Sequence, residues 1–191
     1  MTSSHENSRA ALPSGATVRA GRSSWSWRGA RPPVVALEDA IGGAKTSTTS
    51  ERVFVDSNVI VYAFDVLEAR KREIALGIID RSRRGNTIVS AQVLNETYWC
   101  LTRRLRTPLS GTAARDVVQA LADGRVVPIE PSLVLRAIDR AQYSRLAYWD
   151  ALIVEAALGS SCRRLLTEDL QHGQRFDGLT VENPFRETPP P

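Results

Sequence analysis

Four acidic residues lie where a predicted strand or helix begins or ends, and together they could bind a metal ion. They are Asp56, Glu96, Asp150 and Asp169. Two carboxylates about 4 Å apart repel each other by roughly 4 kcal/mol at an effective dielectric constant of 20. A cluster of four therefore requires raised pKa values or a bound cation. Because the ligands would all be oxygen atoms, the sequence favours Mg²⁺ or Mn²⁺ over zinc.

Each of these acids also has an ordinary structural explanation. Asp56 could cap the helix that follows it, Asp150 could complement the dipole of its own helix, and Glu96 could be a solvated helix position. Against this, Asp150 lies in the apolar segment YWDALIV, and Glu96 lies beside the apolar stripe of its helix. The joint arrangement therefore favours a binding site over four independent surface acids. Surface or cap positions are expected for the other acids of the fold, which are Asp80, Asp116, Asp123, Asp139 and Glu155.

Apolar segments alternate between predicted strands and predicted helices from Arg52 onward. The predicted strands are 52–55, 87–90, 125–130, 163–167 and 179–183, and the predicted helices are 59–64, 68–83, 91–105, 111–124, 132–143 and 150–158. Continuous apolar strands separated by helices are typical of a parallel sheet covered on both faces. We predict an α/β fold, a three-layer α/β/α sandwich with a mostly parallel central sheet.

The predicted sheet brings the acids to a common edge. Asp56 directly follows the first strand, and Asp169 follows the fourth strand by two residues. Asp150 lies in the first turn of its helix, and Glu96 lies one or two turns into the helix after the second strand. Since the exits of parallel strands share one edge, and ligands bind there near the topological switch point, we expect the four side chains to face one crevice.

Four segments carry a resemblance to a known family: VDSNVIVYAFD, SAQVLNETYW, YWDALIVEAAL and LLTEDLQHGQRFDGLTVENPF. In their order, their spacing and the final Asn-Pro-Phe, they resemble the motifs of the PIN-domain family, especially its bacterial VapC-type toxins. By this resemblance the four acids of the family are Asp56, Glu96, Asp150 and Asp169. Two further residues match supporting positions of the family, Asn58 near the first acid and Thr167 near the last.

The resemblance implies a PIN-like fold and a ribonuclease function. The chain would be the toxin of a type II toxin–antitoxin system, a Mg²⁺- or Mn²⁺-dependent endoribonuclease that forms homodimers. A cognate VapB-like antitoxin would inhibit it by placing its tail in the acidic cleft. Asp56 and Asp150 would hold the principal ion, with Glu96 and Asp169 completing its shell, and a metal-activated water would hydrolyse the RNA phosphodiester bond.

The expected products carry 5′-phosphate and 3′-hydroxyl ends. The alternative route through the 2′-hydroxyl uses a pair of histidines, and His172 is the only histidine between residues 51 and 191. His172 could contact an RNA phosphate or could be an ordinary turn residue. Arg103, Arg104 and Arg106 could bind the RNA backbone or could form a solvated helix end.

Three other classes of protein fit the sequence less well. A haloacid-dehalogenase-type phosphatase needs a second aspartate two residues after the first, where this chain has Asn58. A receiver domain needs a lysine after a late strand, but the chain has only Lys45 and Lys71. A non-enzymatic partner-binding module would not need four acids at one edge. Within the family, a processing nuclease and a DNA-directed nuclease stay open.

The composition divides the chain into three parts, 1–50, 51–186 and 187–191. Of the net charge of +4, residues 1–50 carry +3, so the remainder is nearly neutral and gives little evidence of a nucleic-acid partner. Residues 1–50 are rich in Ser, Thr, Gly, Pro and Arg, which predicts a disordered or dispensable extension. A tail that binds RNA or a partner through Trp25 and Trp27 is the alternative.

The sequence predicts a cytoplasmic protein with no membrane partner. No apolar run approaches the roughly 18 residues of a membrane span, and the N-terminus does not resemble a signal peptide. Cys100 and Cys162 have no CxxC spacing and are expected to be free, buried thiols in a reducing compartment.

Overall fold

The computed structural model describes residues 51–82 and 86–186. The predictions for residues 1–50 and 187–191 lie outside this part of the chain, so the predicted division into three parts stays a prediction.

Six strands of the described residues form one sheet in the order β3-β2-β1-β4-β6-β5. Neighbouring strands run parallel except β5 and β6, which are antiparallel. Phe54 in the first strand pairs with Ile88 on one side and with Leu165 on the other. The strands are β1 (Val53–Val55), β2 (Thr87–Ser90), β3 (Arg125–Val127), β4 (Arg164–Leu166), β5 (Arg175–Phe176) and β6 (Leu179–Glu182).

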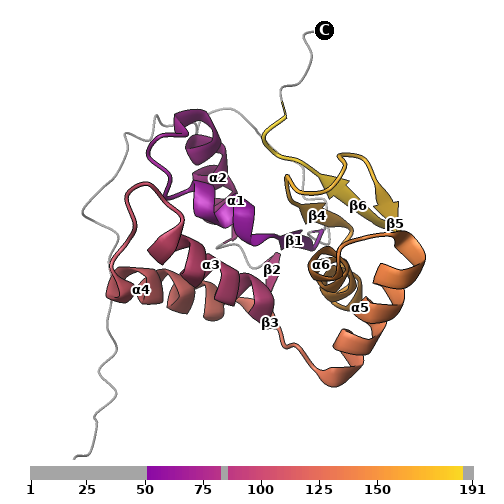
Figure 1. Cartoon of the computed structure of the whole chain (residues 1–191). Helices are drawn as coiled ribbons and strands as arrows, with labels where there is room; N and C mark the ends of the chain where they lie inside the picture. The colour runs from indigo at the N-terminus through magenta and orange to yellow at the C-terminus, as the bar shows by residue number, and fades with distance from the viewer. Residues whose placement is uncertain (1–50, 83–85, 187–191) are drawn as a thin grey trace, which may run out of the picture. The chain divides into compact units, whose positions relative to one another are not determined.

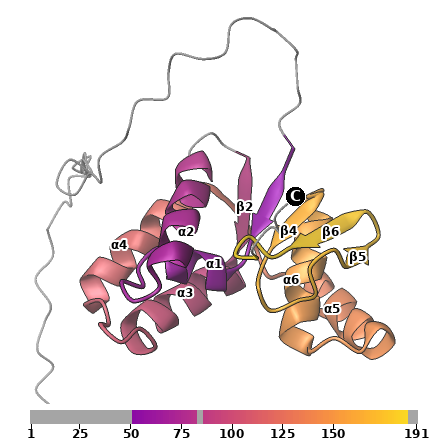
Figure 2. The same ribbon diagram turned by 90° about the horizontal axis from the view of Figure 1, so that it is seen from above.

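Helices cover both faces of the sheet (Figure 1). They are α1 (Ser57–Tyr62), α2 (Ala69–Ser82), α3 (Ala91–Arg103), α4 (Gly111–Ala122), α5 (Pro131–Ser144) and α6 (Tyr148–Gly159). The view from above shows α1 to α4 on one side of the strands and α5 with α6 on the other (Figure 2). The predicted α/β/α sandwich with a mostly parallel sheet is confirmed.

The strand order places a topological switch point between β1 and β4. From β1 the chain adds β2 and β3 on one side, then returns to add β4 and β6 on the other. Right-handed crossovers put the two sets of connecting helices on opposite faces of the sheet. In such sheets a crevice forms at the carboxyl ends of the strands where the order reverses, so the residues after β1 and β4 are placed to bind a ligand.

Local sequence explains where the elements at this edge begin and end. Ser90 caps α3, its hydroxyl accepting a hydrogen bond from the backbone N–H of Val93 at 3.3 Å. The third predicted strand ends at Val127, directly before Pro128, which has no backbone N–H to continue a ladder. The β5–β6 hairpin was not predicted. Its turn has the Asp177-Gly178 sequence with positive φ at both residues, which is a recognised hairpin signal.

Glu155 corrects a prediction. The sequence assigned it to the surface or to a helix cap, but it is buried in α6 at 7% exposure. Its carboxylate accepts hydrogen bonds from Arg136 at 3.3 Å and Arg140 at 2.5 Å, and Arg140 also contacts Asp177 at 2.7 Å. The two arginines on α5 make it possible to bury this acid among the apolar residues of α6, so Glu155 joins α5 to α6.

Both cysteines are free, as predicted, with Cys162 buried and Cys100 only half-buried. None of the helices in residues 51–82 and 86–186 has the length and apolar character required to cross a membrane.

We expect Glu155→Gln to lower the free energy of unfolding by about 3 kcal/mol, because it removes the charge that two arginines are arranged around. Asp177→Asn is the matched control, since the Asp177 carboxylate pairs with the same Arg140 but is 72% exposed. The control should cost less than about 1 kcal/mol. Urea unfolding measures both values, and equal costs would contradict the burial of Glu155.

Candidate active site

Asp56 is the most buried of the four predicted acids, at 8% exposure. It follows β1 directly, and its backbone N–H donates to the carbonyl of Leu166 at 3.0 Å, so the β1–β4 pairing fixes its position. One carboxylate oxygen accepts from the backbone N–H of Ser57 at 2.6 Å. The other accepts from the hydroxyl of Thr167 at 2.8 Å. Asp56 therefore caps α1 and also lies at the exit of β1, as the sequence suggested.

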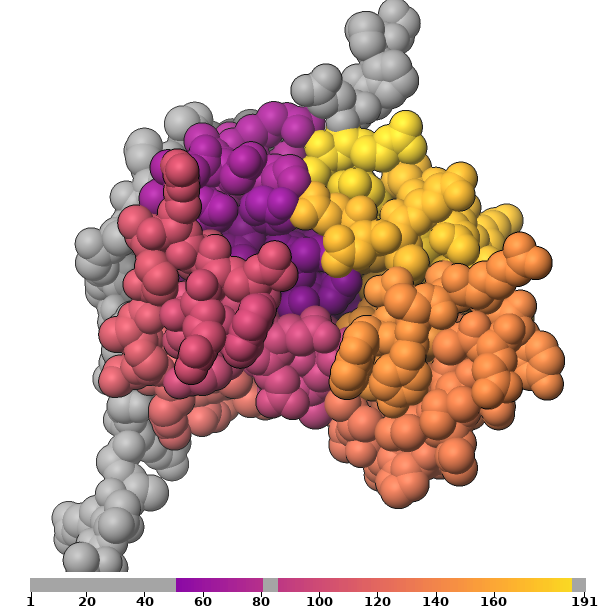
Figure 3. Space-filling model, viewed as in Figure 1, coloured from indigo at the N-terminus to yellow at the C-terminus, as the bar shows by residue number. Residues whose placement is uncertain are grey.

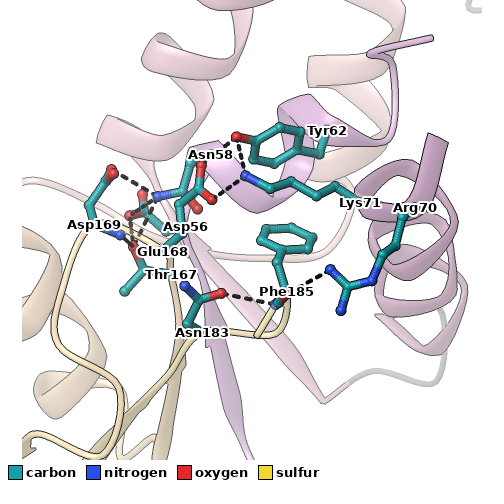
Figure 4. A network of polar contacts seen from close by, with 10 residues as sticks. All are labelled: Asp56, Asn58, Tyr62, Arg70, Lys71, Thr167, Glu168, Asp169, Asn183 and Phe185. Atoms are coloured by element: carbon teal, nitrogen blue, oxygen red, sulfur yellow. Dashed lines mark hydrogen bonds and ion pairs between the residues drawn. The ribbon is translucent and has the colours of Figure 1, made fainter. Parts of the chain in front are cut away.

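Asn58 links the acid after β1 to the acid after β4. Its amide nitrogen lies 3.2 Å from Asp56 Oδ2, 2.9 Å from Thr167 Oγ1 and 2.9 Å from Asp169 Oδ2 (Figure 4). The amide oxygen of Asn58 is buried and has no hydrogen-bond partner among the described residues. The supporting positions predicted for Asn58 and Thr167 thus lie in direct contact with Asp56.

Glu96 joins the cluster from α3. Its carboxylate accepts a hydrogen bond from the Ser57 hydroxyl at 2.7 Å and another from the Gln92 amide at 2.8 Å. The Gln92 amide also lies 3.3 Å from the carbonyl oxygen of Trp149, the residue before Asp150. Gln92 therefore ties the start of α6 to α3 on the side where Glu96 lies.

Asp150 is half-buried in the first turn of α6. Burial raises the pKa of its carboxyl, and the charges of Asp169 and Glu96 raise it further. Within residues 51–82 and 86–186, no side chain donates a hydrogen bond to the Asp150 carboxylate, which leaves its oxygens available to a ligand.

Electrostatic coupling connects all four acids. Burial raises the pKa of Asp56 from 3.8 to about 6, against the hydrogen bonds from Thr167 and the Ser57 N–H, and the charges of Glu96 and Asp169 add to the rise. The structure therefore brings the four predicted acids to one edge of the sheet.

In the described part of the chain, no three His, Cys, Asp or Glu side chains converge as a ready ligand set for a metal ion. The acids are joined instead through the hydroxyl and amide groups of Ser57, Asn58, Thr167 and Gln92.

The site is open to solvent and not enclosed. Asp169 is exposed, and segments from the start and from the end of the described chain meet on the face drawn in Figure 3. Two hollows of about 190 and 180 Å³ lie elsewhere, one beside Arg52 and Arg125 and the other between β3, α5 and α6. None of the four acids lines either hollow.

The predicted basic residues lie at the end of α3 and just after it. Arg103, Arg104 and Arg106 are exposed, and Arg103 lies about 10 Å beyond Glu96 along the helix axis. The guanidinium of Arg104 lies 5.8 Å from the ring centre of Trp99. His172 is exposed, and its Nδ1 accepts from the backbone N–H of Asn183 at 3.2 Å. A role for the three arginines in RNA binding stays a prediction.

Two residues of the cluster were not predicted from the sequence, Ser57 and Gln92. A weak signal exists for each of them. Ser57 directly follows the first acid. Gln92 lies four residues before Glu96 on α3, so the side chains of Gln92 and Glu96 lie on the same face of that helix. The amide oxygen of Gln92 is buried without a hydrogen-bond partner in the described residues, as is that of Asn58.

Comparison with known proteins identifies the family. Residues 53–175 match the model of the PIN domain. The chain belongs to the PIN-domain family. This confirms the resemblance seen in the sequence motifs, and the matched region runs from β1 to the start of β5.

Solved structures share the PIN-domain fold at low sequence identity. A toxin–antitoxin complex from Klebsiella pneumoniae has 17% identity and a TM-score of 0.53, covering 69% of this chain and 97% of that one. FitAB bound to the IR36 DNA fragment has 17% identity and a TM-score of 0.53, covering 71% and 97%. DNA-bound VapBC from Salmonella typhimurium has 16% identity and a TM-score of 0.50, covering 69% and 97%. No curated protein sequence matches this chain.

We expect Asp56 to make stability depend on pH. Its pKa is about 6 in the folded protein against a reference value of 3.8, so the folded state holds the proton more tightly than the unfolded state does. The free energy of unfolding should therefore fall as pH rises from about 4 through 6, by up to roughly 3 kcal/mol. In metal-free buffer, Asp56→Asn should be more stable than the wild type at pH 8 and should lose that advantage at pH 4.

Thermal unfolding at a series of pH values measures this difference. Asp139→Asn, an exposed position on α5, is the control and should follow the wild type throughout. Parallel stability curves for the wild type and Asp56→Asn across this range would contradict the raised pKa of the Asp56 carboxyl.

Proposed function

We propose that this PIN-domain protein is a Mg²⁺- or Mn²⁺-dependent endoribonuclease, the toxin component of a type II toxin–antitoxin system. The observation that carries the proposal is the meeting of four carboxylates at the switch point, where burial, with the charges of neighbouring acids added to it, raises the pKa values of Asp56 and Asp150. Membership of the PIN-domain family supports a nuclease activity. The similar fold of a chain in a toxin–antitoxin complex supports the biological role.

The proposed partners are a cognate VapB-like antitoxin and a second copy of this chain. The support comes from the solved structures of similar fold, which are a toxin–antitoxin complex and DNA-bound VapBC and FitAB. In this chain, an antitoxin segment that enters the acidic edge would need cationic groups to match Asp56, Glu96, Asp150 and Asp169.

The residue types at the site suit a hard divalent cation, because the carboxylates offer oxygen ligands of the kind that Mg²⁺ and Mn²⁺ prefer. In the described residues these carboxylates do not converge as a ready ligand set. The buried amide oxygen of Asn58, unpaired among the described residues, adds a neutral oxygen beside the acids. Asp56 and Asp150 would hold the ion, with Glu96 and Asp169 completing the set directly or through water.

When bound, the ion would polarise a phosphate oxygen and lower the pKa of a coordinated water. The chain itself supplies the positioning. The Thr167 hydroxyl and the Asn58 amide orient Asp56, while Ser57 and Gln92 orient Glu96. Groups held in this way lose little freedom when substrate binds, which is how a positioned site lowers a reaction barrier.

The proposed substrate is RNA held along the open edge of the sheet. Carboxylates repel phosphates, so the polymer needs cationic side chains outside the acidic cluster. Arg103, Arg104 and Arg106 are the residues proposed for this task, since they are exposed on and just after the helix that carries Glu96.

We expect Asp56→Asn and Asp150→Asn each to reduce Mg²⁺-dependent RNA cleavage on the order of 100-fold or more, because each change removes a proposed ligand of the ion, and the loss of a residue that only orients a ligand already costs about 10–100-fold. The measurement is initial cleavage rates on total RNA, with and without Mg²⁺. Asp139→Asn is the matched exchange at an exposed position and should keep the wild-type rate. Undiminished cleavage by a folded Asp56 or Asp150 variant would refute the assignment.

The cleaved RNA should carry 5′-phosphate and 3′-hydroxyl ends. Attack by water displaces the 3′-oxygen, whereas attack by the 2′-hydroxyl leaves a cyclic phosphate and needs an acid–base pair. His172 is the only histidine in the described part of the chain, and its Nδ1 already accepts from Asn183. Adapter ligation to the fragments distinguishes the routes, and 2′,3′-cyclic phosphates would contradict the proposed chemistry.

A further inference from the structure

The adjacent acids Glu168 and Asp169 point to different partners. Asp169 accepts a hydrogen bond from Asn58 in the acidic cluster. Glu168 instead accepts from the hydroxyl of Tyr62 at 2.6 Å and from the ammonium of Lys71 at 2.7 Å. Figure 4 shows the two carboxylates on separate sides of the strand exit. Glu168 therefore belongs to a second network next to the four acids.

Lys71 closes this second network. Its ammonium donates to the Tyr62 hydroxyl at 2.7 Å as well as to Glu168, so the three side chains form a closed ring of hydrogen bonds. The ammonium also lies 4.1 Å from the ring centre of Tyr62 and 5.3 Å from that of Phe185. Cations over aromatic faces are further stabilised. Lys71 is thus held from several directions, with its side chain 27% exposed.

The ring joins two consecutive helices to a segment that is distant in the sequence. Tyr62 ends α1, Lys71 lies near the start of α2, and Glu168 follows β4. The final segment joins through Phe185, whose ring meets that of Tyr62 edge-on at 4.9 Å and whose carbonyl accepts from Arg70 at 2.9 Å. The strand exit that carries Thr167 and Asp169 is therefore anchored on the side away from the acids.

We propose that Lys71 is a positioning residue for the metal-binding acids, acting through Glu168 to hold Thr167 and Asp169 in place against Asp56. Glu168 lies between the two residues that contact Asp56 and Asn58, so its anchoring limits rotation of the backbone at both. Lys71 also compensates the Glu168 charge, which would otherwise add a fifth carboxylate to the repulsion at this edge. This inference rests on the proposed function.

The test is Mn²⁺ binding, measured by electron paramagnetic resonance on the wild type, Lys71→Met, Glu168→Gln and Arg72→Met. Arg72 is an exposed cation next to Lys71 on the same helix and controls for the general loss of positive charge. Simple electrostatics predicts that removing Lys71 strengthens cation binding. Positioning predicts the opposite, a weakening of about 10–100-fold, as for residues that orient metal ligands. Arg72→Met should stay within about 2-fold of the wild type on the same scale.

The double variant Lys71→Met/Glu168→Gln tests whether Lys71 acts through Glu168. The two effects should be strongly non-additive, so that the double variant binds Mn²⁺ about as well as the weaker single variant. Circular dichroism confirms folding of each variant, and Lys71→Arg should recover part of the affinity. Unchanged or tighter binding by Lys71→Met, or fully additive effects, would overturn the inference while leaving the proposed function intact. Absence of saturable Mn²⁺ binding by the wild type would overturn both.

Discussion

Repulsion among four carboxylates at one edge of the sheet is the constraint on which the rest of the site depends. The hydroxyl groups of Ser57 and Thr167 and the amides of Asn58 and Gln92 offset part of it by donating hydrogen bonds. Burial, with the charges of Glu96 and Asp169 added to it, still keeps the pKa of Asp56 near 6 in spite of these hydrogen bonds. The protein therefore keeps a cluster whose charge is not fully compensated by its own side chains, as is common where strain serves function.

The fold makes such a cluster tolerable by building it on rigid elements. Asp56 and Thr167 follow two central strands that pair with each other in the core, so the two residues are held close together. Asp150 and Glu96 come from helices on opposite faces of the sheet, and Gln92 connects those helices at the edge. Closed polar networks rigidify the segments that they join, and the ring of Tyr62, Lys71 and Glu168 does so beside the acids.

The sequence predicts the parts of this arrangement that depend on local pattern. Strand exits followed by acids, capped helices and continuous apolar strands are all local features, and they led to the sheet, to Asp56 and to the other three acids. Contacts between side chains of different elements cannot be predicted in this way. Nothing local shows that Glu155 is buried between two arginines, or that Glu168 turns to Lys71 while Asp169 turns to Asn58, because each partner lies on another element of the fold. The Asp177-Gly178 hairpin did have a local signal and was missed.

The most direct test of the shared site is to locate the cation. Crystals of the protein grown with Mn²⁺ should show one strong anomalous difference peak about 2.0–2.3 Å from carboxylate oxygens of both Asp56 and Asp150, the range for hard cations with oxygen ligands. Glu96 and Asp169 should lie in contact with the ion or with its waters. A peak bound elsewhere, or carboxylates that move apart with no ion between them at saturating Mn²⁺, would contradict the account.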